Sequence, residues 1–217
     1  MKKTNRKNIF ISAMLLVAFV LWTVAIKLID VRSIGPENSY VGFATLNKTV
    51  HSFFGVNISL YVITDWLGLV PVAFCLGFAV LGLLQLIKRR GIFKVDYSII
   101  VLGGLYILVI SAYLFFEAFV INYRPVLING YLEASYPSST TMLTLTVMIT
   151  AIMQLRSRIK AKTLKTAITL IIALFTIFIV IGRALSGVHW ITDIIGGILI
   201  SLGLIFMYYY AHIAWKN

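Results

Sequence analysis

The sequence predicts an all-α integral membrane protein in which six transmembrane helices form a helical bundle. Apolar residues make up 60% of the 217-residue chain, and its mean hydropathy is +0.98. Soluble domains lie nearer half apolar, whereas a spanning helix needs about 20 predominantly apolar residues. Long apolar runs alternate with short basic loops along the whole chain. We therefore expect a single membrane-embedded domain over residues 1–217.

The expected helices follow the apolar runs in order. The first run comes after a basic N-terminal stretch, and because no small-residue cleavage site follows it, we expect it to be retained as a helix. The stretch 40–65 mixes polar and apolar residues, so we expect a surface helix and a turn outside the membrane. Pro71 is acceptable in the first turns of the second helix. The six expected helices cover residues 9–29, 66–87, 97–121, 140–155, 166–185 and 190–213.

The formal net charge of +12 reflects membrane topology. Most of the 19 Lys and Arg residues lie in the N-terminal stretch, in the loops 88–94 and 156–165, and at Lys216. The positive-inside rule then makes both termini cytoplasmic, and this placement argues against nucleic-acid binding. The loops that carry Arg124, Ser138 and His189 consequently face the outside. We expect a multi-pass protein of the plasma (inner) membrane, whose partner is the lipid bilayer.

Arg183, His189 and Asp193 lie at the junction of two apolar runs. His189 and Asp193 are four residues apart, so on a helix they would share a face. A carboxylate there can accept the Nδ1–H of the imidazole, which leaves Nε2 free as a base or nucleophile. Arg183 offers a forked cationic donor set suited to phosphate. A purely structural interpretation is weaker, because an Asp in a spanning helix costs about 2.5–3.5 kcal/mol on insertion scales.

Two further stretches should meet these residues at the same membrane face. Arg124 follows the third expected helix, and Ser138, Ser139 and Thr140 stand at the start of the fourth. A helix that begins here directs free backbone N–H groups toward the outer pocket. Two arginines, two serines and a helix N-terminus form a phosphate cradle, beside which a histidine is a nucleophile for phosphoryl transfer. No His, Cys and Glu spacing indicates a metal site, and we expect no cofactor.

On these residues the chain resembles the type 2 phosphatidic acid phosphatase (PAP2) superfamily, in its bacterial membrane branch. The family's motifs are Lys, six residues, Arg-Pro; then Pro-Ser-Gly-His; then Ser-Arg, five residues, His, three residues, Asp. The order of the motifs and the six-span layout also match. The residues that carry the resemblance are Arg124, Pro125, Pro137, Ser138, Arg183, His189 and Asp193.

The resemblance implies a metal-independent phosphoric-ester or diphosphate hydrolase that acts on a membrane lipid phosphate. It implies that His189 attacks phosphorus and forms a phosphohistidine, while Asp193 orients the imidazole. The phosphoryl oxygens would be held by Arg124, Arg183, Ser138 and the backbone amide of Ser139. Phosphatidic acid, phosphatidylglycerol phosphate and undecaprenyl pyrophosphate all stay open as substrates, and the oligomeric state is not predicted.

Two positions depart from the family pattern in ways that bear on catalysis. The first-motif lysine is Glu117, a carboxylate that repels phosphate. The second-motif histidine, which protonates the leaving group, is Thr140, and threonine is no acid at neutral pH. One interpretation is an enzyme that needs a good leaving group, such as a pyrophosphate ester. In another, a protonated Glu117 or Glu133 serves as the acid, although an Arg124–Glu117 salt bridge is the simpler use.

A third interpretation is a catalytically impaired family member that binds or transports lipid phosphates. A transporter or channel unrelated to phosphate is a further alternative, in which the glycines at 182, 187, 196 and 197 simply allow close helix packing. That alternative leaves the clustering of two arginines with a His–Asp pair unexplained.

Overall fold

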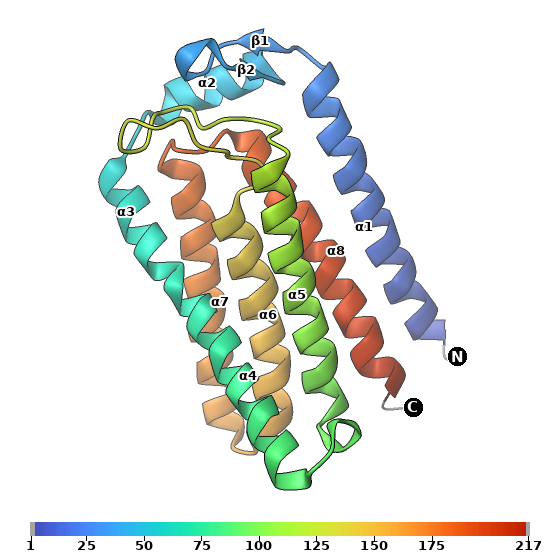
Figure 1. The fold of residues 1–217 in the computed structure, drawn as a ribbon. Helices are drawn as coiled ribbons and strands as arrows, with labels where there is room; N and C mark the ends of the chain where they lie inside the picture. The colour runs from blue at the N-terminus through green and yellow to red at the C-terminus, as the bar shows by residue number, and fades with distance from the viewer. Residues whose placement is uncertain (1–2, 216–217) are drawn as a thin grey trace.

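The structure, a computed structural model, describes residues 3–215 and is a bundle of long helices with a small cap at one end (Figure 1). Lys2 and Lys216, two of the cations that support the expected topology, lie outside the described residues. The bundle consists of α1 (Lys3–Leu28), α3 (Ile58–Leu67), α4 (Leu69–Arg89), α5 (Tyr97–Ala118), α6 (Ser139–Arg158), α7 (Lys162–Leu185) and α8 (Ile191–Trp215).

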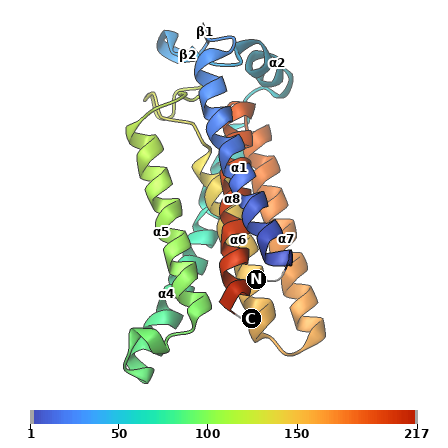
Figure 2. The ribbon, with the colours of Figure 1, turned by 90° about the vertical axis from the view of Figure 1, so that its right-hand side faces the viewer.

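The cap covers the end of the bundle opposite the two termini (Figures 1 and 2). It contains the antiparallel strands β1 (Arg32–Ser33) and β2 (Tyr40–Val41), a 3-10 turn at Pro36–Asn38, and α2 (Ala44–Phe54). The loop 119–138 lies under this cap. The basic loops, including a 3-10 turn at Ile92–Lys94, lie at the other end with the termini.

Five stretches of the described residues are long and apolar enough to cross a membrane. They are Arg6–Leu28, Ile58–Arg89, Tyr97–Ala118, Lys162–Leu185 and Ile191–His212. The remaining long helix, α6, is more polar because its buried face carries several threonines, such as Thr150, whose hydroxyl donates to the Thr146 carbonyl oxygen at 2.7 Å. It packs among α4, α5, α7 and α8, which shield it. The sixth span therefore stays a prediction.

The expectation of a surface helix and a turn over residues 40–65 is wrong for the last part of that stretch, where a helix begins that is long and apolar enough to cross a membrane. α3 begins at Ile58, because the Asn57 side chain accepts a hydrogen bond from the Leu60 N–H at 2.9 Å and caps the helix. α3 and α4 together form one apolar stretch of 32 residues, Ile58–Arg89. The helix is interrupted at Gly68, since the ring of Pro71 clashes with a regular helical carbonyl four residues earlier.

Close contacts between helices hold the bundle together. α1 runs along α8, and its Ser12 hydroxyl donates to the Gly203 carbonyl oxygen at 2.8 Å. A Cβ at Gly182 would lie 2.7 Å from Thr64 Cγ2, so only glycine lets α3 approach α7 this closely. Gly187 has φ +68°, and a Cβ there would collide with the Gly55 carbonyl. Gly182 thus allows α3 to pack closely on α7, and Gly187 lets the α7–α8 loop approach the chain between α2 and α3.

Candidate active site

His189 is the buried centre of the candidate site, and it lies in the loop between α7 and α8. Its Nδ1 is 3.1 Å from the Ser135 carbonyl oxygen, which can only accept, so Nδ1 carries the proton. Its Nε2 lies 3.2 Å from Arg183 Nη2 and 3.3 Å from Arg124 Nη1. Burial and these two cations hold the pKa of His189 well below its ordinary value. The imidazole is therefore neutral, and its Nε2 lone pair accepts hydrogen bonds from the two guanidinium groups.

Asp193 lies in the first turn of α8 and holds the loop around His189. Its Oδ2 accepts the Trp190 backbone N–H at 3.0 Å, and its Oδ1 accepts from Asn122 Nδ2 at 3.1 Å. The first of these bonds is half of a capping box, in which a residue of the first turn binds back to the residue before the helix. Asp193 thus stabilises both the start of α8 and the chain before Arg124.

The expectation that His189 and Asp193 share a helix face is wrong, because α8 begins only at Ile191. Asp193 Oδ2 is 3.9 Å from His189 Nδ1, which is too long for a hydrogen bond. The Ser135 carbonyl takes the Nδ1 proton in its place. Asp193 still lies close enough to favour a positive charge on the imidazole.

Each arginine of the site forms an ion pair with a different carboxylate. The guanidinium groups of both arginines lie over the ring of Tyr61. Arg183 Nη1 is 3.4 Å from Asp65 Oδ1, and Arg124 Nε is 3.0 Å from Glu133 Oε2. The guanidinium carbons lie 5.0 Å (Arg183) and 5.8 Å (Arg124) from the Tyr61 ring centre. The Arg183 side chain is 1% exposed, and its buried Nε has no hydrogen-bond partner among residues 3–215. Arg183 therefore keeps an unused hydrogen-bond donor in the buried site.

The expected salt bridge between Arg124 and Glu117 is wrong. Glu117 is exposed in the last turn of α5, whereas Arg124 pairs with Glu133. The reason is the path of the loop after α5, which folds back on itself. The Arg124 N–H donates to the Glu133 carbonyl oxygen at 3.0 Å, and Tyr123 forms an isolated bridge with Ala134. This pairing brings the two side chains together.

The start of α6 lies against the start of α8. Ser138 is buried, its N–H donates to the Asp193 carbonyl oxygen at 3.1 Å, and its hydroxyl donates to Thr141 Oγ1 at 3.0 Å. The hydroxyl of Ser138 is thus engaged within the first turn of α6. Ser139 and Thr140, by contrast, are half-buried and line a cavity.

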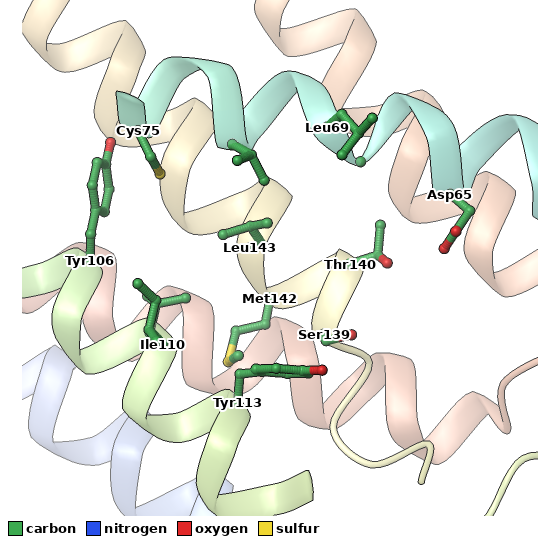
Figure 3. Close-up of a pocket in the computed structure, with 13 residues that line it drawn as sticks. Asp65, Leu69, Cys75, Tyr106, Ile110, Tyr113, Ser139, Thr140, Met142 and Leu143 are labelled. Atoms are coloured by element: carbon green, nitrogen blue, oxygen red, sulfur yellow. The ribbon is translucent and has the colours of Figure 1, made fainter. Parts of the chain in front are cut away.

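This cavity has a volume of about 410 Å³ and lies between α4, α5 and α6 (Figure 3). One end is polar, with Asp65, Ser139 and Thr140, and Figure 3 shows Cys75 and Tyr106 at the opposite end. The wall between these ends is apolar, and its residues include Leu69, Val72, Val109, Ile110, Met142 and Leu143. Its polar end meets the arginine pair through Asp65.

The structure brings together Arg124, Arg183, His189 and Asp193, as predicted. It places Ser138 against Asp193, whereas Ser139 and Thr140 line the cavity. Sequence reasoning missed Asn122, Ser135, Tyr61 and Asp65. A signal for Asp65 was present, since an ionisable residue inside an apolar helix is itself a mark of function. Asn122 and Ser135 carry no such signal, because they act through a carbonyl or an amide. Among residues 3–215, no group of three or more His, Cys, Asp or Glu side chains gathers that could hold a metal ion.

The fold is that of a membrane phosphatase of the PAP2 type. A solved structure of the transmembrane PAP2-type phosphatidylglycerolphosphate phosphatase from Bacillus subtilis superposes with a TM-score of 0.59, over 94% of this chain and 96% of that chain. The two sequences are 17% identical, so this likeness establishes the fold alone. The family model of the PAP2 superfamily matches residues 102–216, more than half of the chain.

The chain therefore belongs to the PAP2 superfamily, whose members are phosphatases, and the resemblance seen in its motifs is confirmed. No curated protein sequence matches the chain.

Proposed function

We propose that the protein is a lipid-phosphate phosphatase that works through a phosphohistidine at His189 and prefers lipid diphosphates. The observation that carries this proposal is the neutral imidazole whose Nε2 faces two buried guanidinium groups, 3.2 and 3.3 Å away. Neutral imidazole is a nucleophile, and two converging cations create a place for an anion. A phosphoryl group bound there has its phosphorus next to the attacking atom.

The surroundings of the imidazole support phosphoryl transfer. As Nε2 bonds to phosphorus, the ring gains positive charge. The Nδ1–H bond to the Ser135 carbonyl oxygen, and the Asp193 carboxylate 3.9 Å away, both favour that charge. Arg124 and Arg183 stabilise the negative charge on the phosphoryl oxygens, which accounts for electrostatic catalysis without a further cation.

The cavity at the start of α6 supports a lipid substrate. A lipid phosphate has a charged head and an apolar tail, and the cavity has a polar end near the arginines and an apolar wall. We infer that the tail lies between α4, α5 and α6 while the head reaches His189. Because Thr140 is no acid, the oxygen that leaves must depart without a proton. A phosphate monoester leaves more readily than an alcohol, which favours diphosphates such as undecaprenyl pyrophosphate over phosphatidic acid or phosphatidylglycerol phosphate.

We further propose that the protein is a single six-span domain of the plasma membrane with cytoplasmic termini. The polar α6 crosses as the sixth span because its neighbours shield it from lipid. The basic loops lie at the same end as the termini, and the candidate site lies at the opposite end under the cap (Figure 1). By the positive-inside rule the site then faces outside.

Phosphate release by the purified protein in detergent tests the proposed activity. The substrates are undecaprenyl pyrophosphate, phosphatidic acid and phosphatidylglycerol phosphate, and the variants are His189→Ala and the control His212→Ala, near the end of α8 that is remote from the site. We expect release from the diphosphate by the wild type and by His212→Ala, and loss of release with His189→Ala. Equally slow release by the wild type and His189→Ala from all three lipids would contradict the proposal.

One alternative function has a specific observation in its favour. Glu117 and Thr140 replace the family's cation and acid, which would leave a protein that binds or transports lipid phosphates without hydrolysis. Tight binding of a lipid phosphate with no turnover would support this alternative. Acid-labile label trapped on His189 from a ³²P-labelled lipid would exclude it.

A further inference from the structure

We propose that Asp65 is a further catalytic residue, which takes the proton from the water that hydrolyses the phosphohistidine. This inference rests on the proposed function, because it concerns the second half of that reaction. Asp65 lies near the end of α3, inside the apolar stretch Ile58–Arg89. A carboxylate inside an apolar helix has an unfavourable free energy of insertion, so it is expected to have an ionic partner or a function.

The contacts of Asp65 do not explain it as a structural ion pair. Within residues 3–215 its single ion pair is with Arg183 Nη1, at 3.4 Å, and its own side chain is 54% exposed. A pair that is open on one side contributes little to stability. Glu133 is the matched case on the other arginine, with an ion pair of 3.0 Å to Arg124 Nε. The Asp65 and Glu133 carboxylates differ in whether they line the cavity at the start of α6.

Asp65 reaches the cavity that we assign to the lipid, and Glu133 does not line it. Figure 3 shows Asp65 on one side of the polar end and Thr140 on the other. Asp65 also lines a smaller pocket of about 290 Å³ together with Tyr61 and Asn129, so it stands between the cavity and the loop 119–138. Among the residues that line the larger cavity, Asp65 is the one carboxylate.

The position of the cavity relative to His189 defines where water attacks. In phosphoryl transfer the attacking and leaving groups are roughly in line across phosphorus. The leaving oxygen is attached to the lipid, which lies in the cavity, so the phosphohistidine is afterwards open to water from the cavity side. The Arg183 guanidinium links the two ends of this line, with Nη2 3.2 Å from His189 Nε2 and Nη1 3.4 Å from Asp65 Oδ1.

The helix packing holds Asp65 in register with the nucleophile. Thr64 packs on Gly182, where a Cβ would lie 2.7 Å from Thr64 Cγ2. The next residue of each helix forms the Asp65–Arg183 pair. Two consecutive residues of α3 therefore meet two consecutive residues of α7, which positions the carboxylate without a further contact.

The bonds and protons of the two half-reactions balance with the Asp65 carboxylate as the only proton acceptor, and no proton from Thr140 is needed. In the first, Nε2 of His189 bonds to the terminal phosphorus, the bond to the bridging oxygen breaks, and the lipid monophosphate leaves with that electron pair. In the second, the water oxygen bonds to phosphorus while its proton passes to Asp65. The P–N bond breaks, its electron pair returns to Nε2, and inorganic phosphate departs. Asp65 then releases its proton to solvent.

The experiment measures phosphoenzyme in the full-length protein in detergent. Undecaprenyl pyrophosphate labelled with ³²P in its terminal phosphoryl group is mixed with wild type, Asp65→Asn, Asp65→Glu or Glu133→Gln, and the reaction is quenched in base. Loss of a general base typically slows a step about 10²–10⁴-fold. We expect Asp65→Asn to lower kcat by a factor in this range while label accumulates on His189. Asp65→Glu should restore part of kcat.

The matched control separates hydrolysis from binding. Glu133→Gln is expected to change KM without accumulation of label, because it alters the charge next to Arg124 alone. The inference is overturned if Asp65→Asn turns over within threefold of the wild type. It is also overturned if Asp65→Asn loses turnover and label together while its thermal unfolding matches the wild type, since Asp65 would then serve only to hold Arg183. A wild type that releases no phosphate and takes up no label would instead overturn the proposed function.

Discussion

Replacement of Gly196 by alanine tests how the start of α6 is held against α8. A Cβ at this position would collide with the ring of Tyr136, whose Cζ and Oη would both lie 2.8 Å away. The ring cannot move freely, because Tyr136 is 2% exposed and stacks on Phe19 with 6.1 Å between ring centres. Its hydroxyl shares a hydrogen bond of 2.7 Å with Thr23 Oγ1.

The expected loss of stability follows from these contacts. Overpacking a well-packed site costs about 1–3 kcal/mol. Loss of the Tyr136–Thr23 hydrogen bond adds about 0.5–1.5 kcal/mol. Alanine in place of glycine inside a helix returns about 1 kcal/mol. The free energy of unfolding should therefore fall by about 0.5–3.5 kcal/mol. At about 2–4 °C per kcal/mol for a chain of this length, Tm falls by about 1–14 °C.

The control is Gly103→Ala on α5, because a Cβ at Gly103 would meet nothing within 4 Å. Thermal unfolding of both variants in the same detergent should show Gly103→Ala at or above the wild type and Gly196→Ala below it. Phosphate release should also fall with Gly196→Ala, since Tyr136 follows Ser135, whose carbonyl holds His189. Equal Tm values for the two variants would refute this account of the packing.

Three further predictions concern the chemistry of the site. Because burial and two guanidinium charges lower the pKa of His189, Arg124→Gln should raise that pKa. His189 attacks as the neutral ring, so the acidic limb of the pH profile of kcat/KM should move to higher pH than in the wild type. An acidic limb at the same pH as in the wild type would contradict the electrostatic argument. Asn122, 1% exposed, donates to Asp193, and Asn122→Ala should cost about 1.5–3 kcal/mol in thermal unfolding, whereas a stability equal to that of the wild type would show the bond to be dispensable. Thr140→His places an acid at the polar end of the cavity and should raise the rate on phosphatidic acid relative to that on undecaprenyl pyrophosphate, measured as a ratio of kcat/KM values; an unchanged ratio would contradict the role given to the leaving group.

Most of the fold could be predicted because long apolar runs in the sequence identify membrane-spanning helices. Five of the predicted helices correspond to stretches apolar enough to span, with ends that differ by a few residues. The start of the second helix was predicted too late in the sequence, because Asp65 was interpreted as part of the polar segment before that helix. Asn57 caps α3 well before that point, and Pro71 only interrupts the helix. Asp65 could have been noted as an ionisable residue beside an apolar run, but only the structure shows that Arg183 is its partner.

By itself the sequence determined the family, the basic end of the bundle, and the residues whose chemistry is scarce in an apolar chain. Arg124, Arg183 and His189 stand out because ionisable residues are scarce between the apolar runs on that side of the chain. Only the tertiary structure decided how these residues are held. Their partners are a backbone carbonyl at Ser135, a helix-capping Asp193 and carboxylates from distant segments. Such contacts depend on which segments the packing brings within about 3–4 Å of each other. The spacing of residues in the sequence does not show which distant segments become neighbours.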